Sequence, residues 1–215
     1  MDKFATYEQE QRLRRELVNW GKELYDQGLV KGSGGNLSIR MDENTVLLTP
    51  TGFFLGHMSE ACISKCSVHG EHLDGCPPTK EVPLHLAAYE IRPNVRAVCH
   101  THSIYATTFA SMAEPGACMP VYVPSVAAKV GQVQVAPFAF PGSEELGEYV
   151  RNGILKSNAV LLGNHGVVAV GKDMETAVSC ANEVENDLMI HFLSQGKART
   201  LTESDLKHLF AKVSL

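Results

Sequence analysis

Apolar positions recur at helical spacing in several parts of the chain. The first such segment predicts a helix over about residues 7–27 with Gly28 as its stop. Its apolar face consists of Leu13, Leu17, Trp20 and Leu24. The same criteria predict five more helices, at about 80–91, 103–112, 143–154, 173–195 and 202–210.

Polar residues that favour helix starts precede three of these segments. Thr79 and Ser143 stand where N-caps are expected, and Thr202 has Asp205 three residues later, the spacing of a capping box. Pro83 is compatible with the first turn of its helix, because proline is tolerated there. The helix predicted near 80–91 therefore begins at Thr79–Lys80.

Short apolar runs bounded by turn residues predict strands between the helices. One long run is interrupted by Asn164-His165-Gly166, which predicts two strands joined by a hairpin or bend. The segment 57–80 is rich in turn residues and is predicted to be loop. Strands are expected at 37–40, 45–48, 95–100, 133–138 and in the two halves of 158–171. This order predicts a single α/β domain over residues 1–215.

Composition excludes several classes of protein. A net charge of −5 is opposite to the basic surface that nucleic acid or an anionic membrane requires. No apolar run approaches the roughly 20 residues of a membrane span, and the first residues do not form a secretory signal. Six scattered cysteines without CxxC pairs predict no disulfide or cysteine–metal framework. A cytoplasmic protein is expected.

Three histidines are candidate metal ligands. On an extended strand His100 and His102 project to the same side, so both imidazoles can reach one ion. His165 lies in the break of an apolar run, where a side chain is presented rather than packed. Catalytic zinc sites commonly use three protein ligands and one open position. The spacing alone leaves open that His100 and His102 are simply polar residues at a strand end.

Other ionisable residues are ambiguous from the sequence alone. Glu81 falls in the first turn of the predicted helix, where a carboxylate also serves helix stability. His85 lies four residues further on the same face, and a hydrogen-bonded structural histidine is the preferred interpretation. The remaining five histidines are not assigned to the metal: His57, His69, His72, His191 and His208.

Three glycine- or hydroxyl-bearing turns are candidate anion sites. Residues 32–36 (GSGGN) and 49–52 (TPTG) offer free backbone N–H groups. Thr79 and Lys80 precede a predicted helix, whose N-terminus attracts anions. None has the pattern of a nucleotide-binding loop, so a nucleotide site is not expected.

Taken in order, these motifs resemble the class II aldolase/adducin family. The matching segments are GSGGNLS (32–38), LTPTG (48–52), PTKE (78–81), HTH (100–102) and NHG (164–166). The resemblance covers about residues 10–210 and implies one class II aldolase/adducin-like domain. It further implies an α/β fold with a central, mostly antiparallel sheet flanked by helices, and a C4 homotetramer with active sites near subunit interfaces.

The resemblance also implies roles for individual residues. His100, His102 and His165 take the positions of zinc ligands, with one zinc, or another divalent metal, per chain. Glu81 takes the position of an acid/base that also ligates the metal. The positions of phosphate binding are occupied by Asn36, Thr51, Gly52 and Thr79, with Lys80 beside them.

Within the family, PTKEVPLHLAAY and PSVAAKVGQVQVAPFAFPG are most similar to the 3-oxo-tetronate 4-phosphate decarboxylases. That subgroup implies decarboxylation to dihydroxyacetone phosphate and CO2 through a metal-stabilised enediolate. Lys129 and Ser125 depart from its pattern, and Tyr122 is the nearest aromatic candidate for a proton donor to a neighbouring subunit's site. Fuculose-phosphate aldolases rank second, ribulose-phosphate 4-epimerases third, and a non-catalytic adducin-like module is the alternative of a different class.

Overall fold

An eight-stranded sheet forms the centre of the molecule. The computed structural model describes residues 3–215, with side chains from residue 7 onward. The sheet order is β4-β3-β2-β1-β5-β8-β7-β6, and only β6 and β7 pair in parallel. The strands are β1 (Asn36–Arg40), β2 (Thr45–Leu48), β3 (Ser64–Ser67), β4 (His72–Asp74), β5 (Ala97–Thr101), β6 (Val135–Ala136), β7 (Ala159–Leu162) and β8 (Gly166–Gly171). The predicted α/β fold with a mostly antiparallel sheet is confirmed.

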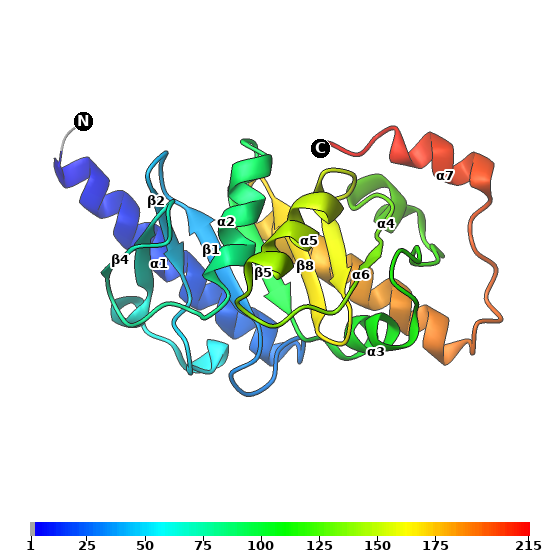
Figure 1. The fold of residues 1–215 in the computed structure, drawn as a ribbon, viewed down its shortest axis with the longest axis horizontal. Helices are drawn as coiled ribbons and strands as arrows, with labels where there is room; N and C mark the ends of the chain where they lie inside the picture. Colours follow the sequence, from blue (N-terminus) through cyan, green and yellow to red (C-terminus); the bar gives the residue numbers. More distant parts are fainter. Residues whose placement is uncertain (1–2) are drawn as a thin grey trace.

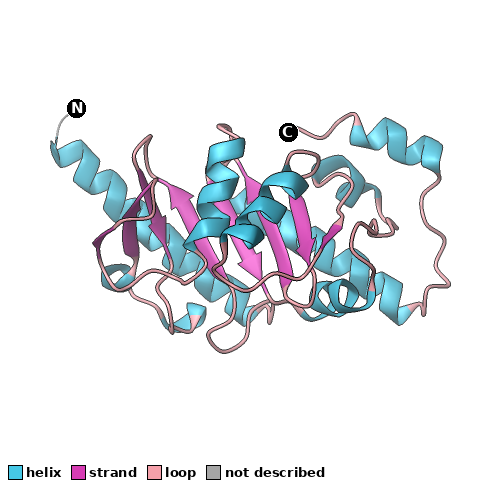
Figure 2. Ribbon diagram, viewed as in Figure 1, coloured by secondary structure: helices cyan, strands magenta, loops and turns pink. Residues whose placement is uncertain are grey.

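Helices cover both faces of this sheet (Figures 1 and 2). In the view of Figure 1, α2 and α5 lie in front of the strands, and α1 and α6 lie behind them. The helices are α1 (Lys3–Asp26), α2 (Val82–Ile91), α3 (Ile104–Met112), α4 (Pro124–Lys129), α5 (Glu144–Ile154), α6 (Met174–Leu193) and α7 (Glu203–Phe210). None of these helices is both long and apolar enough to cross a membrane.

The two helical layers enclose two apolar cores, one on each face. Alternate residues of the central strands enter different cores because successive side chains of a strand point to opposite faces. On β5, Ala97 and Cys99 belong to one core and Val98 to the other. On β8, Val167 and Val168 divide in the same way. The central strands are therefore apolar on both faces, which explains why they read as continuous apolar runs.

Several predicted helices and caps agree with the structure. Gly28 follows α1 with a φ of 75°, and Gly196 follows α6 with a φ of 70°, the left-handed geometry that ends helices. The Ser143 hydroxyl accepts the N–H of Leu146 at 3.2 Å. Thr202 and Asp205 form a reciprocal capping box at α7. The hairpin of β7 and β8 is also confirmed.

The turn-rich segment 57–80 holds regular structure that the sequence pattern does not predict. It contains β3, β4 and the 3-10 turn η2 (Glu60–Cys62), and another 3-10 turn, η1 (Leu55–His57), ends at its first residue. β3 pairs with β2 along its whole length, whereas β4 is fully exposed at the sheet edge. Both strands are short and polar, so a periodicity criterion does not detect them, and β3 is bonded to β2, which is distant in sequence.

Two further expectations need correction. The helix predicted from Thr79 begins at Val82, and Glu81 rather than Thr79 occupies its N-cap position. The Thr79 hydroxyl accepts the N–H of Glu81 at 3.2 Å, so it supports the approach to the helix. The strand expected at 133–138 shrinks to β6, and α4 was not predicted. All six cysteines are free.

A buried carboxylate ties the segment before α4 to α6. Asp187, fully buried on α6, accepts the backbone N–H groups of Tyr122 and Val123 at 3.0–3.2 Å. Burial raises the pKa of Asp187 to about 6, although these two N–H groups favour its ionised form. The folded chain therefore holds a proton on Asp187 at pH values where the unfolded chain has released it.

This raised pKa predicts a pH-dependent stability. Between about pH 4 and 6 the folded state binds more protons at Asp187 than the unfolded state, so the unfolding free energy decreases as pH rises. Relative to wild type, Asp187→Asn should gain stability across this range, by on the order of 2 kcal/mol. Denaturant unfolding at a series of pH values measures this difference. Parallel pH profiles for the two proteins would contradict the prediction.

Candidate metal centre

The sheet brings the three candidate histidines to the same end of adjacent strands. His100 lies on β5, between Asn36 of β1 and Val168 of β8 in the strand register. His102 follows the last residue of β5, and His165 lies in the turn between β7 and β8. Glu81 reaches the same point from the start of α2. Three segments distant in sequence therefore converge on one position.

The four side chains form a compact cluster. One ligand atom from each of Glu81, His100, His102 and His165 lies within 4.8 Å of the others. The Glu81 Oε2 atom lies 3.3 Å from His100 Nε2, and Glu81 Oε1 lies 3.2 Å from His165 Nε2. The Nε2 atoms of His100 and His102 are 3.0 Å apart. Sequence reasoning selected these four residues, and the structure brings all four together.

The hydrogen bonding of the cluster fits a cation. His100 Nδ1 lies 3.0 Å from the Val167 carbonyl, which only accepts, so Nδ1 carries a proton and Nε2 faces the cluster. His100 Nε2 lies within reach of His102 Nε2 and of a carboxylate oxygen of Glu81. Nitrogen and oxygen atoms gathered this closely around a carboxylate suit a shared proton or a bound metal ion. The donor set of three imidazoles and one carboxylate suits zinc.

The same surroundings keep Glu81 ionised. Burial alone would raise the pKa of its carboxyl. The charge of His100 and hydrogen bonds from His100, His165 and Asn36 outweigh burial and hold the pKa of Glu81 well below its usual range. Asn36 contributes the shortest of these contacts, from Nδ2 to Oε2 at 2.7 Å. Glu81 is therefore a buried carboxylate that is available as a ligand or a base.

Hydrogen bonds also hold the segments that carry the ligands. The carboxylate of Glu185 on α6 accepts the N–H groups of Tyr105 and Ala106 in the first turn of α3, at 2.9 and 2.8 Å. This contact holds the chain immediately after His102. Asn164 adopts a left-handed φ of 56° in the β7–β8 turn, a conformation that asparagine tolerates. It directs the chain so that His165 enters the cluster.

The glycine-rich loop lies against the histidines. A Cβ atom added to Gly34 would come within 2.9 Å of His102 Nδ1 and 3.2 Å of the Lys31 carbonyl oxygen. The sequence singled out this loop only as an anion-binding turn. Its contact with the His102 ring was missed, because the loop and the HTH segment are separated by over sixty residues.

This contact makes Gly34→Ala a test of the cluster geometry. The added methyl group should displace the His102 ring and weaken metal binding by about 10- to 100-fold, as changes next to metal ligands commonly do. Competition with a fluorescent chelator measures the affinity. Gly147→Ala is the control, because Gly147 has the helical backbone of α5 and the atom nearest to an added Cβ lies at 3.4 Å. Equal affinity in Gly34→Ala and wild type would contradict the prediction.

The candidate phosphate residues lie on neighbouring segments. The Thr51 N–H donates to the Pro77 carbonyl at 3.0 Å, and the Thr79 N–H donates to the Thr49 carbonyl at 3.2 Å. These bonds hold the loop of Thr51 and Gly52 beside the loop of Thr79 and Lys80, with Gly52 and Lys80 exposed.

Asn36 lies next to Glu81 rather than on either loop. One N–H of the Asn36 side-chain amide donates to the Glu81 carboxylate, and the second N–H is left to donate to a ligand.

Residues expected near the tail of the substrate site lie apart from the cluster within one chain. Ser125 and Lys129 both bond Glu183, each at 2.7 Å. The Tyr122 hydroxyl lies 2.8 Å from His191 Nδ1, so Tyr122 contacts no member of the cluster in its own chain. His85 is fully buried and hydrogen-bonded through both ring nitrogens.

Comparison with known proteins agrees with this geometry. The family described as Class II Aldolase and Adducin N-terminal domain matches residues 15–192. The chain belongs to the class II aldolase/adducin family. The resemblance noted in the sequence is thereby confirmed, and the remaining comparisons concern its position within the family.

The most similar relatives include enzymes of two kinds. A 3-oxo-tetronate 4-phosphate decarboxylase from Haemophilus influenzae is 38% identical over 196 residues, which cover 90% of this chain and 93% of that protein. An L-fuculose phosphate aldolase from Methanococcus maripaludis is 34% identical over 170 residues, covering 79% and 91%. The crystal structure of YgbL from Escherichia coli has a TM-score of 0.89 at 30% identity, covering 94% and 99%. The expectation of an enzyme of the lyase class is confirmed.

Proposed function

We propose that the protein decarboxylates a 3-oxo-tetronate 4-phosphate, releasing CO2 and dihydroxyacetone phosphate. The observation that carries this proposal is the convergence of His100, His102, His165 and Glu81, whose ligand atoms lie within 4.8 Å of one another. The similarity of the whole chain to the decarboxylase from Haemophilus influenzae favours this reaction over the others of the family.

His100, His102 and His165 would hold one zinc ion per chain, with Glu81 as a fourth, displaceable ligand. Other divalent metals also suit this donor set. When bound, zinc supplies a Lewis acid that polarises a carbonyl group and stabilises negative charge on its oxygen. Val167 orients His100 by accepting its Nδ1–H, so that Nε2 faces the metal position.

Glu81 would hold and deliver the proton that the carbon atom needs after CO2 has left. Loss of CO2 breaks the C1–C2 bond of the 3-oxo acid and leaves its electron pair at C2, conjugated with the C3 carbonyl. One proton must then reach C2 to complete dihydroxyacetone phosphate. Glu81 is the buried acid/base of the cluster and is positioned to hold and deliver it.

The phosphate group of the substrate would bind beside the loops of Thr51, Gly52, Thr79 and Lys80. The free side-chain N–H of Asn36 would donate to it. Hydroxyl and backbone N–H donors with one lysine charge suit a phosphate dianion. Binding there supplies orientation and remote binding energy, which lowers the barrier at the reacting carbon.

A substrate panel tests the proposed reaction. Purified zinc-loaded protein is incubated with both stereoisomers of 3-oxo-tetronate 4-phosphate, and CO2 and dihydroxyacetone phosphate are measured. The same preparation is assayed for condensation of lactaldehyde with dihydroxyacetone phosphate and for epimerisation of ribulose 5-phosphate. If condensation were faster than decarboxylation, the protein would be a fuculose-phosphate-type aldolase and the proposal would be wrong. This second candidate is favoured by the 34% identity to the aldolase from Methanococcus maripaludis.

Metal content separates an enzyme from a binding module. We expect about one zinc per chain by elemental analysis of protein purified without chelators. A stably folded wild-type protein that binds no divalent metal would favour the adducin-like module and refute a metal-dependent lyase.

We also propose a C4 homotetramer of cytoplasmic chains with active sites near the subunit contacts. Support comes from exposed apolar side chains around the cluster end of the fold, on α3 and on the loop after β6: Ile104, Met112, Phe138 and Phe140. Phe138 and Phe140 contact each other edge to face and are 51% and 74% exposed. Apolar surface of this kind marks an interaction site more often than free surface.

This assembly predicts that Phe138→Ser/Phe140→Ser shifts the protein from tetramer to smaller species. Sedimentation velocity measures the shift. Leu155→Ser is the control, because Leu155 is 49% exposed but lies at the end of α5, away from this surface. A wild-type monomer, or a double variant that remains tetrameric, would contradict the proposed interface.

A further inference from the structure

A row of buried polar side chains leads away from Glu81 between α2 and β1. Glu81, His85 and Tyr89 recur every four residues and so share one face of the helix. Asn36 and Ser38 are two apart on β1 and share one face of the strand. All five side chains are at least nine-tenths buried. The two faces meet, so their polar groups must satisfy one another.

The contacts form one unbranched chain. Asn36 Nδ2 donates to Glu81 Oε2 at 2.7 Å, and Asn36 Oδ1 lies 2.5 Å from His85 Nε2. His85 Nδ1 lies 2.7 Å from the Ser38 hydroxyl, which in turn lies 2.7 Å from the Tyr89 hydroxyl. We name these four residues, Tyr89, Ser38, His85 and Asn36, the α2–β1 polar chain.

The direction of every hydrogen bond in this chain follows from the orientation of the Asn36 amide. Its NH2 group donates to Glu81 Oε2 and its carbonyl oxygen faces His85 Nε2. His85 must then donate from Nε2, which leaves Nδ1 as an acceptor for the Ser38 proton. Ser38 has no second proton, so Tyr89 donates to it. Each group therefore donates its hydrogen bond to the next group toward the metal cluster. Hydrogen bonds aligned in this way polarise one another.

We propose that the α2–β1 polar chain is a positioning device for Glu81, with His85 as its essential member. His85 prevents the Asn36 amide from turning its carbonyl oxygen toward the carboxylate. It thereby holds Glu81 aligned with the metal position while the reaction proceeds. The role assigned to Glu81 rests on the proposed function, whereas the direction of the chain rests on the contacts alone.

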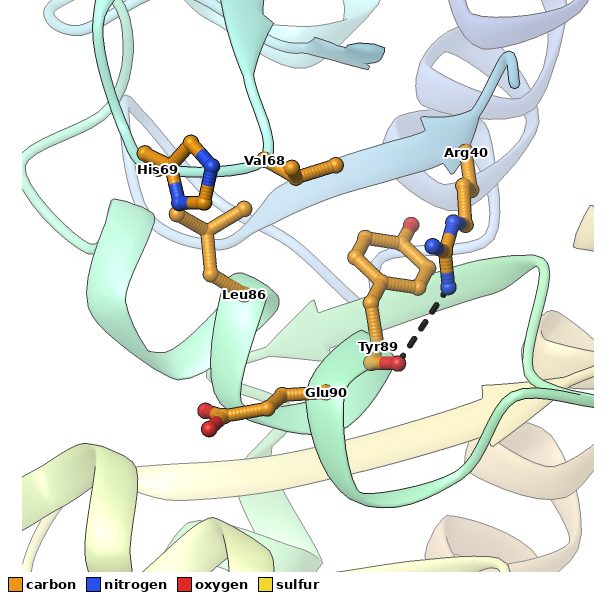
Figure 3. Close-up of a pocket in the computed structure, with 6 residues that line it drawn as sticks. All are labelled: Arg40, Val68, His69, Leu86, Tyr89 and Glu90. Carbon is orange, nitrogen blue, oxygen red and sulfur yellow. Dashed lines mark hydrogen bonds between the residues drawn. The ribbon is translucent and has the colours of Figure 1, made fainter. Parts of the chain in front are cut away.

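Charge and surroundings agree with this role. Burial and the nearby charge of His100 lower the pKa of His85 to about 3, so His85 is neutral at physiological pH and has a single N–H to donate. The chain ends at Tyr89, beside an open pocket of about 360 Å3 (Figure 3). There the guanidinium of Arg40 bonds the Tyr89 carbonyl rather than its hydroxyl, which leaves the hydroxyl to Ser38.

Nitrogen NMR of the histidine rings tests the direction of the chain without any substrate. Metal-free and zinc-loaded protein labelled with 15N should both show His85 as the neutral tautomer with the proton on Nε2. Assignment comes from comparison with His85→Gln. A His85 ring protonated on Nδ1, or on both nitrogens at neutral pH, would overturn the proposal. This readout remains informative even if every candidate substrate fails.

Variants test the positioning role. His85→Leu should lower kcat or zinc affinity by about 10- to 100-fold while KM for the phosphorylated substrate changes little. Ser38→Ala should have a smaller effect of the same kind, and Tyr89→Phe the smallest. His85→Gln keeps a donor and should recover part of the loss. Full kcat and unchanged zinc dissociation in a folded His85→Leu variant would overturn the proposal.

Two matched substitutions control for loss of stability. Ser157 is buried like Ser38, but its hydroxyl donates to the Val130 carbonyl at 2.9 Å, far from the cluster in the fold. Ser157→Ala should lower the melting temperature without changing kcat or zinc affinity. Tyr149→Phe controls for the loss of a tyrosine hydroxyl away from the cluster, because the Tyr149 hydroxyl donates to Glu145 at 2.9 Å on the surface. If His85→Leu does not fold, Ser38→Ala and Tyr89→Phe decide the question: effects no larger than those of their controls refute the positioning role.

Discussion

Replacing His100 and His102 with alanine is expected to abolish zinc binding and to lower kcat/KM by at least about three orders of magnitude. The Nε2 atoms of these residues lie 3.0 Å apart and supply two of the four converging donors. Without them, only His165 and Glu81 remain, and two ligands do not make a catalytic zinc site. The metal's stabilisation of negative charge, worth several kcal/mol, is lost with it.

Elemental analysis and steady-state kinetics measure this loss in the double variant. His208→Ala is the matched control, because His208 is exposed on α7 and has no part in the cluster. It should keep the zinc content and activity of wild type. Zinc retained at one per chain in the folded double variant would show that the metal binds elsewhere.

Glu81→Gln is expected to lower kcat by about 10²- to 10⁴-fold, the usual range for loss of a general acid/base. Glutamine preserves the size of the side chain but cannot take up or release the proton. His100, His102 and His165 remain, so zinc should stay bound. The phosphate loops are unchanged, so KM should change far less than kcat.

A set of substitutions at the start and end of α2 measures this effect. Glu81→Asp keeps the carboxylate but shortens its reach, and it should recover part of the activity. Glu90→Gln is the control, because Glu90 lies on the same helix with an exposed side chain. If the Glu81→Gln variant kept the kcat of wild type, Glu81 would not be the residue that transfers the proton. Loss of zinc in that variant would instead make Glu81 primarily a ligand.

Much of the candidate site was predictable because its ligands follow local rules. His100 and His102 are two apart on a strand, and their ring centroids lie 4.8 Å apart in the structure. His165 stands in the turn of a hairpin whose two strands are each apolar and short. Strand periodicity and turn chemistry act over a few residues, so both features are visible in the sequence.

Other parts of the site depend on contacts between distant segments. The bond from Asn36 to Glu81 joins residues 45 apart, and the approach of Gly34 to the His102 ring depends on the pairing of β1 with β5. The spacing of Glu81, His85 and Tyr89 along one helix was a usable signal. Its meaning required knowing that this face of α2 meets Asn36 and Ser38.

The sequence by itself determined the α/β class, the helices other than α4, the caps of α5 and α7 and the family, and through the family resemblance the four converging residues. These follow from periodicity, residue chemistry and ordered motifs. Only the tertiary structure decided that β3 and β4 extend the sheet, that α2 begins at Val82, and which donors hold Glu81. The physical reason is that hydrogen bonds between strands, and the burial that forces polar groups to pair, arise from segments that meet only in the folded chain.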